Sequence, residues 1–165
     1  MVFLGYSDVL LDPKHRLAIP AKFRRNLELE KGDLGQLVLV PGAPDNTLWL
    51  YPEKVFIQLV GQAKSSLIPG EDLRRFDQAY FPVGEVLEAD SQGRILIPDR
   101  LIEESGLGRE VVMCGVRDHL EIWPRDAFQK HMAESKARFH ELHSRARDAY
   151  QEPMRRPSRD DWANP

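Results

Sequence analysis

Two short stretches of the chain each place an aspartate four residues before an arginine. The first is Asp12-Pro-Lys-His-Arg16, and the second is Asp90-Ser-Gln-Gly-Arg94. An aspartate in a tight turn accepts hydrogen bonds from nearby backbone N–H groups, and a guanidinium can pair with that carboxylate or with a phosphate. The spacing therefore predicts two carboxylate-stabilised turns, which we call turn 1 (residues 12–16) and turn 2 (residues 90–94), and it leaves two roles open for each arginine.

His15 and Gly93 occupy matching positions in the two turns, one residue before the arginine. The turn is expected to need a positive φ at this position, which glycine adopts more readily than histidine. We assign structural roles in the turns to Asp12, Asp90, Gly93 and Arg94.

Cations gather around turn 1. Between residues 12 and 25, five Lys and Arg side chains oppose the single anion Asp12, for a net charge of +4. Such a cluster can neutralise phosphates and release their counterions, although a solvated helix face is the other reading of a charge run. We predict that this cluster contacts DNA through Lys14, His15, Arg16, Lys22, Arg24 and Arg25.

The second stretch has the opposite balance. From residue 90 to 107, two arginines oppose four carboxylates, for a net charge of −2. A phosphate-facing surface needs cations, so this part of the chain is expected to serve as a scaffold. The whole chain carries a net charge of −3, which makes the distribution of charge more informative than its total.

No other set of residues points to catalysis or metal binding. His140 and His143 are three residues apart on a charged helix without an evident third ligand, and Cys114 lies in an apolar strand. A convergent nucleophile, base and oxyanion donor are missing. We expect no enzyme activity, cofactor, metal or small-molecule substrate.

The composition is typical of a globular protein of a reducing compartment. The chain has 165 residues, 42% of them hydrophobic, and one cysteine that cannot form an internal disulfide. No apolar run approaches the roughly 18 residues that span a bilayer, and the first residues lack the basic start of a signal peptide. We expect a cytoplasmic protein without a membrane partner.

The turns belong to a longer internal repeat. Residues 12–20 match residues 90–98 at an offset of 78, and residues 50–56 match residues 122–128 at an offset of 72. Apolar periodicity and proline positions predict the order β-β-α-β-β-α in each copy, with short helices at residues 21–27 and 99–105. The expected class is α+β, with a first half at residues 1–69, a connector at 70–80 that is partly helical, and a second half at 81–128.

Four short strands cannot bury both of their faces alone, so the halves are expected to pair into a pseudo-two-fold β-barrel. A long C-terminal helix is predicted over roughly residues 125–150. The part of it that lies beyond the second half is assigned to residues 129–151. A flexible tail rich in proline and arginine is predicted at residues 152–165.

The duplicated motif resembles the MraZ family of the AbrB-like swapped-hairpin superfamily. The second copy carries the resemblance through Asp90-Ser-Gln-Gly-Arg94-Ile-Leu-Ile-Pro98, Gly106-Leu107 and Glu121-Ile-Trp123. The first carries it through Leu11-Asp12-Pro-Lys14-His-Arg16-Leu-Ala-Ile-Pro20, Phe23-Arg24 and Tyr51-Pro52. The similarity covers roughly residues 1–130, and the duplicated set is much more specific than a single Asp-x-x-x-Arg.

The resemblance implies a swapped-hairpin barrel and a function. Members of the family regulate transcription of the division and cell-wall gene cluster, bind repeated elements in the promoter of their own operon, and assemble into ring-shaped homo-oligomers. The expected partner is double-stranded promoter DNA at the nucleoid, with Arg16 as a contacting arginine and repression as the outcome. The alternative is an antitoxin-like module of the same superfamily that binds a partner protein.

Overall fold

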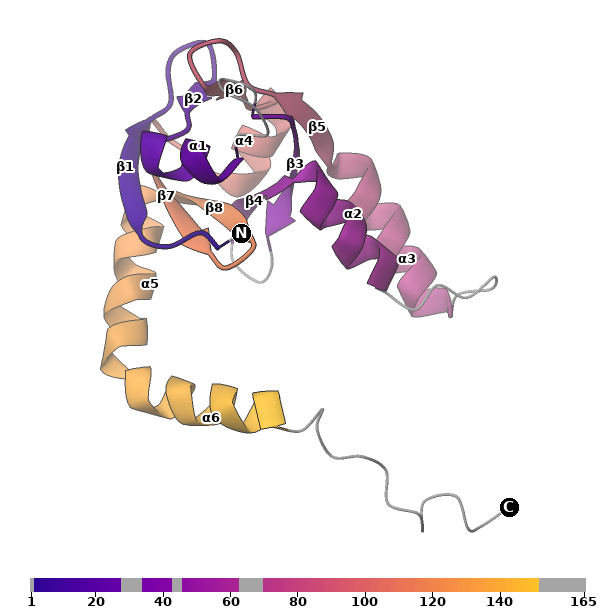
Figure 1. Ribbon diagram of the computed structural model, residues 1–165, viewed down its shortest axis with the longest axis vertical. Coiled ribbons are helices and arrows are strands. Elements are labelled where there is room, and N and C mark those ends of the chain that lie inside the picture. The colour runs from indigo at the N-terminus through magenta and orange to yellow at the C-terminus, as the bar shows by residue number, and fades with distance from the viewer. Residues whose placement is uncertain (1, 28–33, 43–45, 63–69, 152–165) are drawn as a thin grey trace. The chain divides into compact units, whose positions relative to one another are not determined.

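The computed structural model describes residues 2–27, 34–42, 46–62 and 70–151, and the predicted tail at residues 152–165 lies outside them. The chain divides into two compact units, Met1–Phe128 and Gln129–Pro165. The first unit contains all the strands that the structure describes (Figure 1). No helix in the described part of the chain is long and apolar enough to cross a membrane.

The first unit is an α+β structure, as predicted, and its elements recur in the same order. The first half contains β1 (Tyr6–Leu10), β2 (Arg16–Ala18), α1 (Ala21–Leu27), β3 (Gln36–Gly42), β4 (Thr47–Pro52) and α2 (Glu53–Gln62). The second half contains β5 (Glu85–Glu88), β6 (Arg94–Leu96), α4 (Asp99–Ser105), β7 (Glu110–Val116), β8 (His119–Pro124) and the start of α5 (Arg125–Ala137). Between them lie α3 (Glu71–Tyr80) and the 3-10 turn η1 (Phe81–Val83), so the connector is helical.

The strands of the two halves pair with each other. One sheet has the order β1-β7-β8-β4-β3-β5, and a two-stranded ribbon joins β2 to β6. The pairs β1–β7, β3–β5, β4–β8 and β2–β6 are antiparallel, and each joins a strand of the first half to a strand of the second. Each half thus supplies hydrogen-bonding partners for strand edges that the other half would leave exposed.

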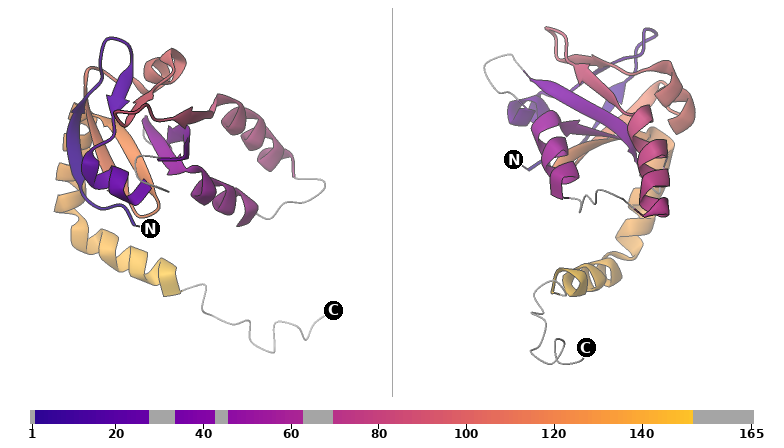
Figure 2. Two further views of the ribbon diagram at one scale, coloured as in Figure 1. Left: turned by 45° about the horizontal axis from the view of Figure 1, so that its top comes forward. Right: turned by 90° about the vertical axis from the view of Figure 1, so that its right-hand side faces the viewer.

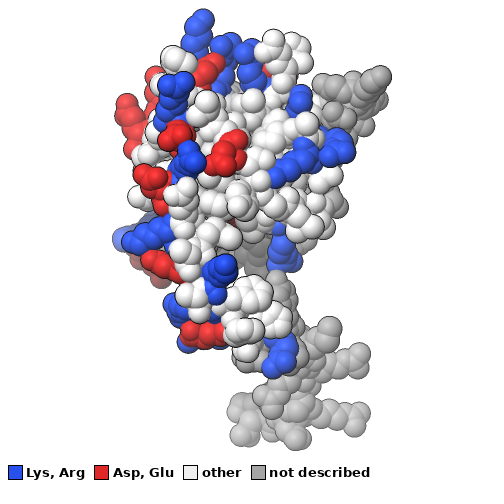
Figure 3. All heavy atoms as spheres, turned by 90° about the vertical axis from the view of Figure 1, so that its left-hand side faces the viewer, with Lys and Arg blue, Asp and Glu red and all other residues white. Residues whose placement is uncertain are grey.

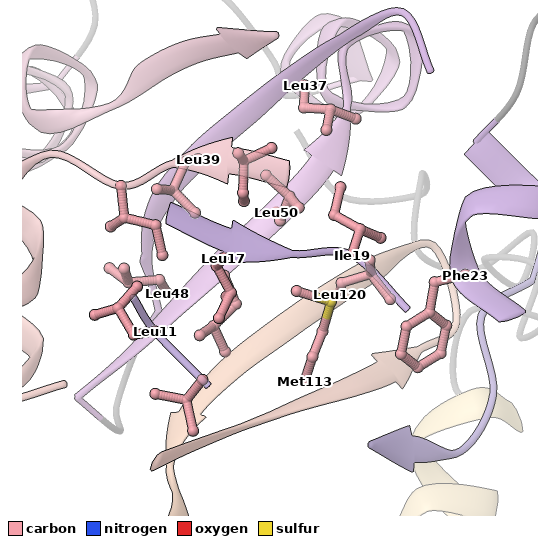
Figure 4. Close-up of a cluster of buried hydrophobic side chains, with 14 of the residues drawn as sticks. Leu11, Leu17, Ile19, Phe23, Leu37, Leu39, Leu48, Leu50, Met113 and Leu120 are labelled. Atoms are coloured by element: carbon pink, nitrogen blue, oxygen red, sulfur yellow. The ribbon is translucent and has the colours of Figure 1, made fainter. Parts of the chain in front are cut away.

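A shared core fills the space between the ribbon and the large sheet. Leu17 of β2 and Ile95 of β6 are fully buried, because alternate side chains of a strand point to opposite faces. Figure 4 shows Leu17 among Leu50 and Leu120 of the large sheet. Burial of such side chains stabilises the fold by roughly 1.5–3 kcal/mol each, so neither half is expected to fold alone.

The short helices begin at prolines. Pro98 precedes α4, and its carbonyl accepts a hydrogen bond from Leu101 N at 3.0 Å. Proline suits this place because its fixed φ is compatible with the helix and its missing N–H would have no helical partner. The helices at residues 21–27 and 99–105 have the predicted bounds, and Phe23 and Leu27 face the core as their spacing predicts.

The other face of the large sheet carries a buried histidine. His119 stacks on Tyr51 with ring centroids 4.6 Å apart and lies 5.0 Å from the Trp49 ring. Its Nδ1 lies 2.8 Å from Asp118 Oδ1, and its Nε2 lies 3.4 Å from Glu121 Oε1 without hydrogen-bond geometry. Two carboxylates therefore flank an imidazole that is only 8% exposed.

The prediction of one C-terminal helix over residues 125–150 is wrong. The structure has two helices, α5 and α6 (Phe139–Gln151), which are separated at Arg138. The guanidinium of Arg138 binds the Glu141 carboxylate at 3.1 and 3.2 Å, and Arg145 binds the same carboxylate at 2.6 Å. A carboxylate in the first turn of α6 favours a helix start there, because it complements the positive end of the helix dipole.

Candidate nucleic-acid interface

Turn 1 is built around the carboxylate of Asp12. Its Oδ1 accepts hydrogen bonds from Lys14 N at 2.8 Å and Arg16 N at 2.9 Å. Its Oδ2 accepts a hydrogen bond from Arg16 Nε at 2.8 Å and lies 2.7 Å from Arg16 Nη2. The turn thus holds the guanidinium of Arg16 in one place through two nitrogen atoms.

Turn 2 repeats this arrangement around Asp90. Its Oδ1 accepts hydrogen bonds from Gln92 N at 2.9 Å and Arg94 N at 3.0 Å, and its Oδ2 accepts one from Arg94 Nε at 2.8 Å. Arg16 and Arg94 therefore make the same local contacts. The pairing with aspartate does not by itself distinguish a DNA-contacting arginine from a structural one.

Both aspartates are held in the ionised form. The backbone hydrogen bond from Arg16 is the main reason why the pKa of Asp12 is lowered, and the side-chain hydrogen bond from Arg94 is the main cause for Asp90, whose pKa falls to about 2. Each aspartate offsets the charge of its own arginine, so the net positive charge of turn 1 comes from Lys14.

The position before each arginine has the positive φ expected from the sequence. It is 58° at His15 and 73° at Gly93. The carbonyl of His15 accepts a hydrogen bond from Ile97 N, just after β6, and the carbonyl of Gly93 accepts one from Ile19 N, just after β2, both at 2.9 Å. Each turn is therefore hydrogen-bonded to the end of the strand that follows the other turn. This reciprocal bonding keeps the two turns in a fixed relation to one another.

The helices of the two halves cross over to the opposite turns. His15 Nδ1 of turn 1 lies 2.6 Å from Asp99 Oδ1, at the start of α4. In return, Arg24 of α1 lies against Gly93 and donates a hydrogen bond from Nη1 to Gln92 O at 3.4 Å in turn 2. The charge run predicts Arg24 beside turn 1. That prediction is wrong, because strand pairing between the halves brings α1 to turn 2.

The other predicted DNA contacts fall into separate groups. Lys14, His15 and Arg16 lie together in turn 1, with Lys14 exposed. Lys22 Nζ donates to Tyr6 O and lies 4.8 Å from the centroid of the Phe23 ring, while Arg25 is exposed on α1. The six predicted residues are therefore spread over turn 1, turn 2 and the neighbourhood of β1.

The two turns lie at the same end of the first unit (Figures 1 and 2). Figure 3 shows Lys and Arg side chains at this end, with acidic side chains beside them. The acidic residues that follow turn 2 predict a scaffold role for it, and only the fold shows that turn 2 lies at the same end of the unit as turn 1.

A cation of the second half also lies near turn 1. Arg109 lines a surface hollow of about 400 Å³ together with Asp12, Pro13 and His15. The carbonyl of Arg109 accepts a hydrogen bond from Leu11 N at 2.9 Å, so the backbone holds it beside the base of the turn. No feature of the sequence pattern indicated this residue. In the described part of the chain, no group of three or more His, Cys, Asp or Glu residues could hold a metal ion.

Comparison with known proteins matches most of the chain to one family. The family model described as "MraZ protein, putative antitoxin-like" matches residues 2–77 and 85–149. The chain belongs to the MraZ family. The resemblance inferred from the duplicated Asp-x-x-x-Arg motif is thereby confirmed.

Several relatives in the MraZ family are named "Transcriptional regulator MraZ". The protein of Desulforamulus reducens is 33% identical over 141 residues, which are 86% of this chain and 94% of the relative. That of Thermomicrobium roseum is 40% identical over 122 residues, 74% of this chain and 81% of the relative. That of Pelotomaculum thermopropionicum is 35% identical over 141 residues, 86% of this chain and 92% of the relative.

Proposed function

We propose that this chain is a DNA-binding transcriptional regulator and that turn 1 is its main DNA contact. The observation that carries the proposal is the exposed Lys14 beside an Arg16 that Asp12 holds in position. A positioned arginine can bind phosphate or base edges with little loss of side-chain entropy on binding. The names of the relatives support the same function.

The proposed target is a set of repeated elements in the promoter of the protein's own operon, in the division and cell-wall gene cluster. Binding there represses transcription, and the protein acts in the cytoplasm at the nucleoid. Family membership supports these points.

The proposed architecture is the swapped-hairpin barrel, in which the two halves are related by a pseudo-two-fold axis. The strand pairs between the halves and the crossed contacts of Arg24 and Asp99 support it. Within this barrel, turn 1 of the first half carries the DNA contact, and the second half positions turn 1.

We further propose that the protein works as a ring-shaped homo-oligomer. One turn offers few cations on a chain of net charge −3, so a single subunit should bind DNA only in the range of roughly 10⁻⁴–10⁻⁶ M typical of non-specific contact. Subunits that engage successive DNA repeats make later contacts intramolecular and can raise the affinity by roughly 10²–10⁴-fold.

A mobility-shift experiment tests the proposal. DNA from upstream of the gene is divided into duplexes with one, two and three repeats, and the size of the protein is measured by light scattering after size exclusion. We expect an assembly larger than a dimer and a steep gain in affinity from one repeat to two. Absence of binding to every upstream duplex contradicts the regulator proposal, and a monomer that binds one repeat as tightly as three contradicts the assembly.

A further inference from the structure

The β2–β6 ribbon presents four side chains away from the core. Arg16 pairs with Leu96 across the strands, Leu17 with Ile95, and Ala18 with Arg94. The central pair is fully buried, so the alternation of the strands turns the flanking pairs outward. Leu96 is 58% exposed, whereas its neighbours in sequence, Ile95 and Ile97, are fully buried.

The two arginines of this ribbon are turned towards aspartates in their own turns. The guanidiniums of Arg16 and Arg94 reach back to Asp12 and Asp90 in their own turns, with N–O distances of 2.7 Å. Leu96 stands directly opposite Arg16 in the register, where paired Cβ atoms are roughly 4.5–5.5 Å apart. An exposed apolar side chain therefore lies opposite the positioned Arg16 and two residues from Arg94 on the same strand, on a surface proposed to face DNA.

A leucine at this place has a specific use on DNA. Contacts to phosphates position a protein but carry no direct sequence information, which is read at the base edges. The major groove admits a two-stranded β-ribbon, and there thymine presents a C5-methyl group that apolar side chains contact. If turn 1 holds a phosphate, the ribbon that begins at Arg16 is the part that can approach the bases.

We propose that Leu96 is a specificity-determining residue that packs against a thymine methyl group in the major groove. The inference rests on the proposed DNA-binding function and adds a base contact to it. The residue that matches Leu96 in the first half, at an offset of 78, is Ala18, whose single methyl group reaches less far from the ribbon than a leucine side chain. The ribbon therefore reads thymine on one side only and distinguishes the two directions along the DNA.

The test removes the methyl group from the DNA rather than from the protein. Fluorescence anisotropy compares binding of the upstream duplex with binding of a duplex in which deoxyuracil replaces thymine. Deoxyuracil lacks only the C5-methyl group. The replacement is made first at every thymine together and then at one thymine at a time. Burial of one methyl group is worth about 0.8 kcal/mol, which corresponds to about a fourfold change in affinity. The unaltered protein should therefore bind the duplex about fourfold more weakly when the contacted thymine is replaced.

Leu96→Ala identifies the side chain responsible. The variant should bind the thymine duplex about as weakly as the unaltered protein binds the uracil duplex, and should show no difference between the two. The matched control is Leu73→Ala, since Leu73 is 43% exposed on α3, in the connector between the two halves. It should keep the full preference for thymine.

Two outcomes separate this inference from the proposed function. If the unaltered protein binds both duplexes tightly and with equal affinity, the thymine contact is overturned and DNA binding is left intact. A Leu96→Ala variant that still prefers the thymine duplex has the same consequence. No binding to any upstream duplex overturns the proposed function together with the inference. The comparison of duplexes needs no variant, so it decides the question even where Leu96→Ala is poorly folded.

Discussion

His15 and Asp99 join the two halves of the molecule at turn 1, with 2.6 Å between Nδ1 and Oδ1. The residues are far apart in sequence, and His15 stands where turn 2 has a glycine. Arg24 makes the reciprocal connection from α1 to turn 2. Each turn is therefore supported by a helix from the other half, and an acidic side chain of α4 lies beside turn 1, the proposed DNA contact.

Gly93→Ala should destabilise the fold. Gly93 has a φ of 73°, and a Cβ there would lie 2.6 Å from Arg24 Cδ. A left-handed backbone costs an alanine roughly 1–2 kcal/mol, and Arg24 would also have to move. Urea unfolding should show this loss, whereas the control Gly108→Ala, with open space and no positive φ, should change stability by about 0.5 kcal/mol or less. Equal stabilities of the two variants would contradict the role assigned to Gly93.

Arg16→Ala should weaken DNA binding more than Arg94→Ala. The two arginines make the same contacts with their aspartates, so both variants should lose a similar and small amount of stability. Loss of a DNA contact costs roughly 1–3 kcal/mol, so we expect about a tenfold or larger loss of affinity for Arg16→Ala and about threefold or less for Arg94→Ala.

Binding isotherms on the same upstream duplex at several salt concentrations measure this difference. The slope of log affinity against log salt should become shallower for Arg16→Ala if it contacts a phosphate. Equal losses in both variants, with folding unchanged, would mean that turn 2 takes an equal part in DNA binding and is not merely a scaffold.

Turn 2 should lose stability in acid. The pKa of Asp90 is lowered from 3.8 to about 2, first because of the hydrogen bond from the Arg94 side chain. A carboxyl group whose pKa is lower in the folded state stabilises the fold above its unfolded-state pKa, and this contribution disappears as the pH falls from about 4 to about 2. The difference in unfolding free energy between the unaltered protein and Asp90→Asn should shrink across this range. A constant difference would contradict the assignment.

His119 should make the stability of the fold decrease as the pH rises. Burial lowers the pKa of His119, but Glu121 and Asp118 outweigh that effect, so the pKa lies above 6.5. A raised folded-state pKa stabilises the fold fully below the unfolded-state value, and the contribution is lost as the pH rises through the folded-state pKa. Trp49 and Tyr51, which face His119 from β4, provide no anion to change this sign in the neutral range.

His119→Phe is the variant that isolates this effect, since it keeps a ring to stack on Tyr51. Unfolding by urea at a series of pH values above about 6 should show a fall in stability for the unaltered protein and a flatter profile for the variant. Parallel profiles would mean that His119 does not titrate between its two carboxylates.

The local features of this protein follow from its sequence because short-range chemistry determines them. The Asp-x-x-x-Arg spacing predicted both turns, and the match of His15 to Gly93 predicted a positive φ at each. Proline at the helix start and the spacing of Phe23 and Leu27 predicted α1 with its bounds and its buried face. Hydrogen bonds within a few residues and the period of a helix are sufficient for all of these.

The composition of the candidate interface depended on contacts between distant residues. The pairing of β2 with β6 places Arg24 at turn 2, Asp99 at turn 1, and the exposed Leu96 opposite Arg16. An arginine or leucine has the same local propensities whichever half covers it, so its sequence neighbours do not indicate its partner. Only burial of a core shared by both halves decides that partner, because neither half can cover its own strands alone.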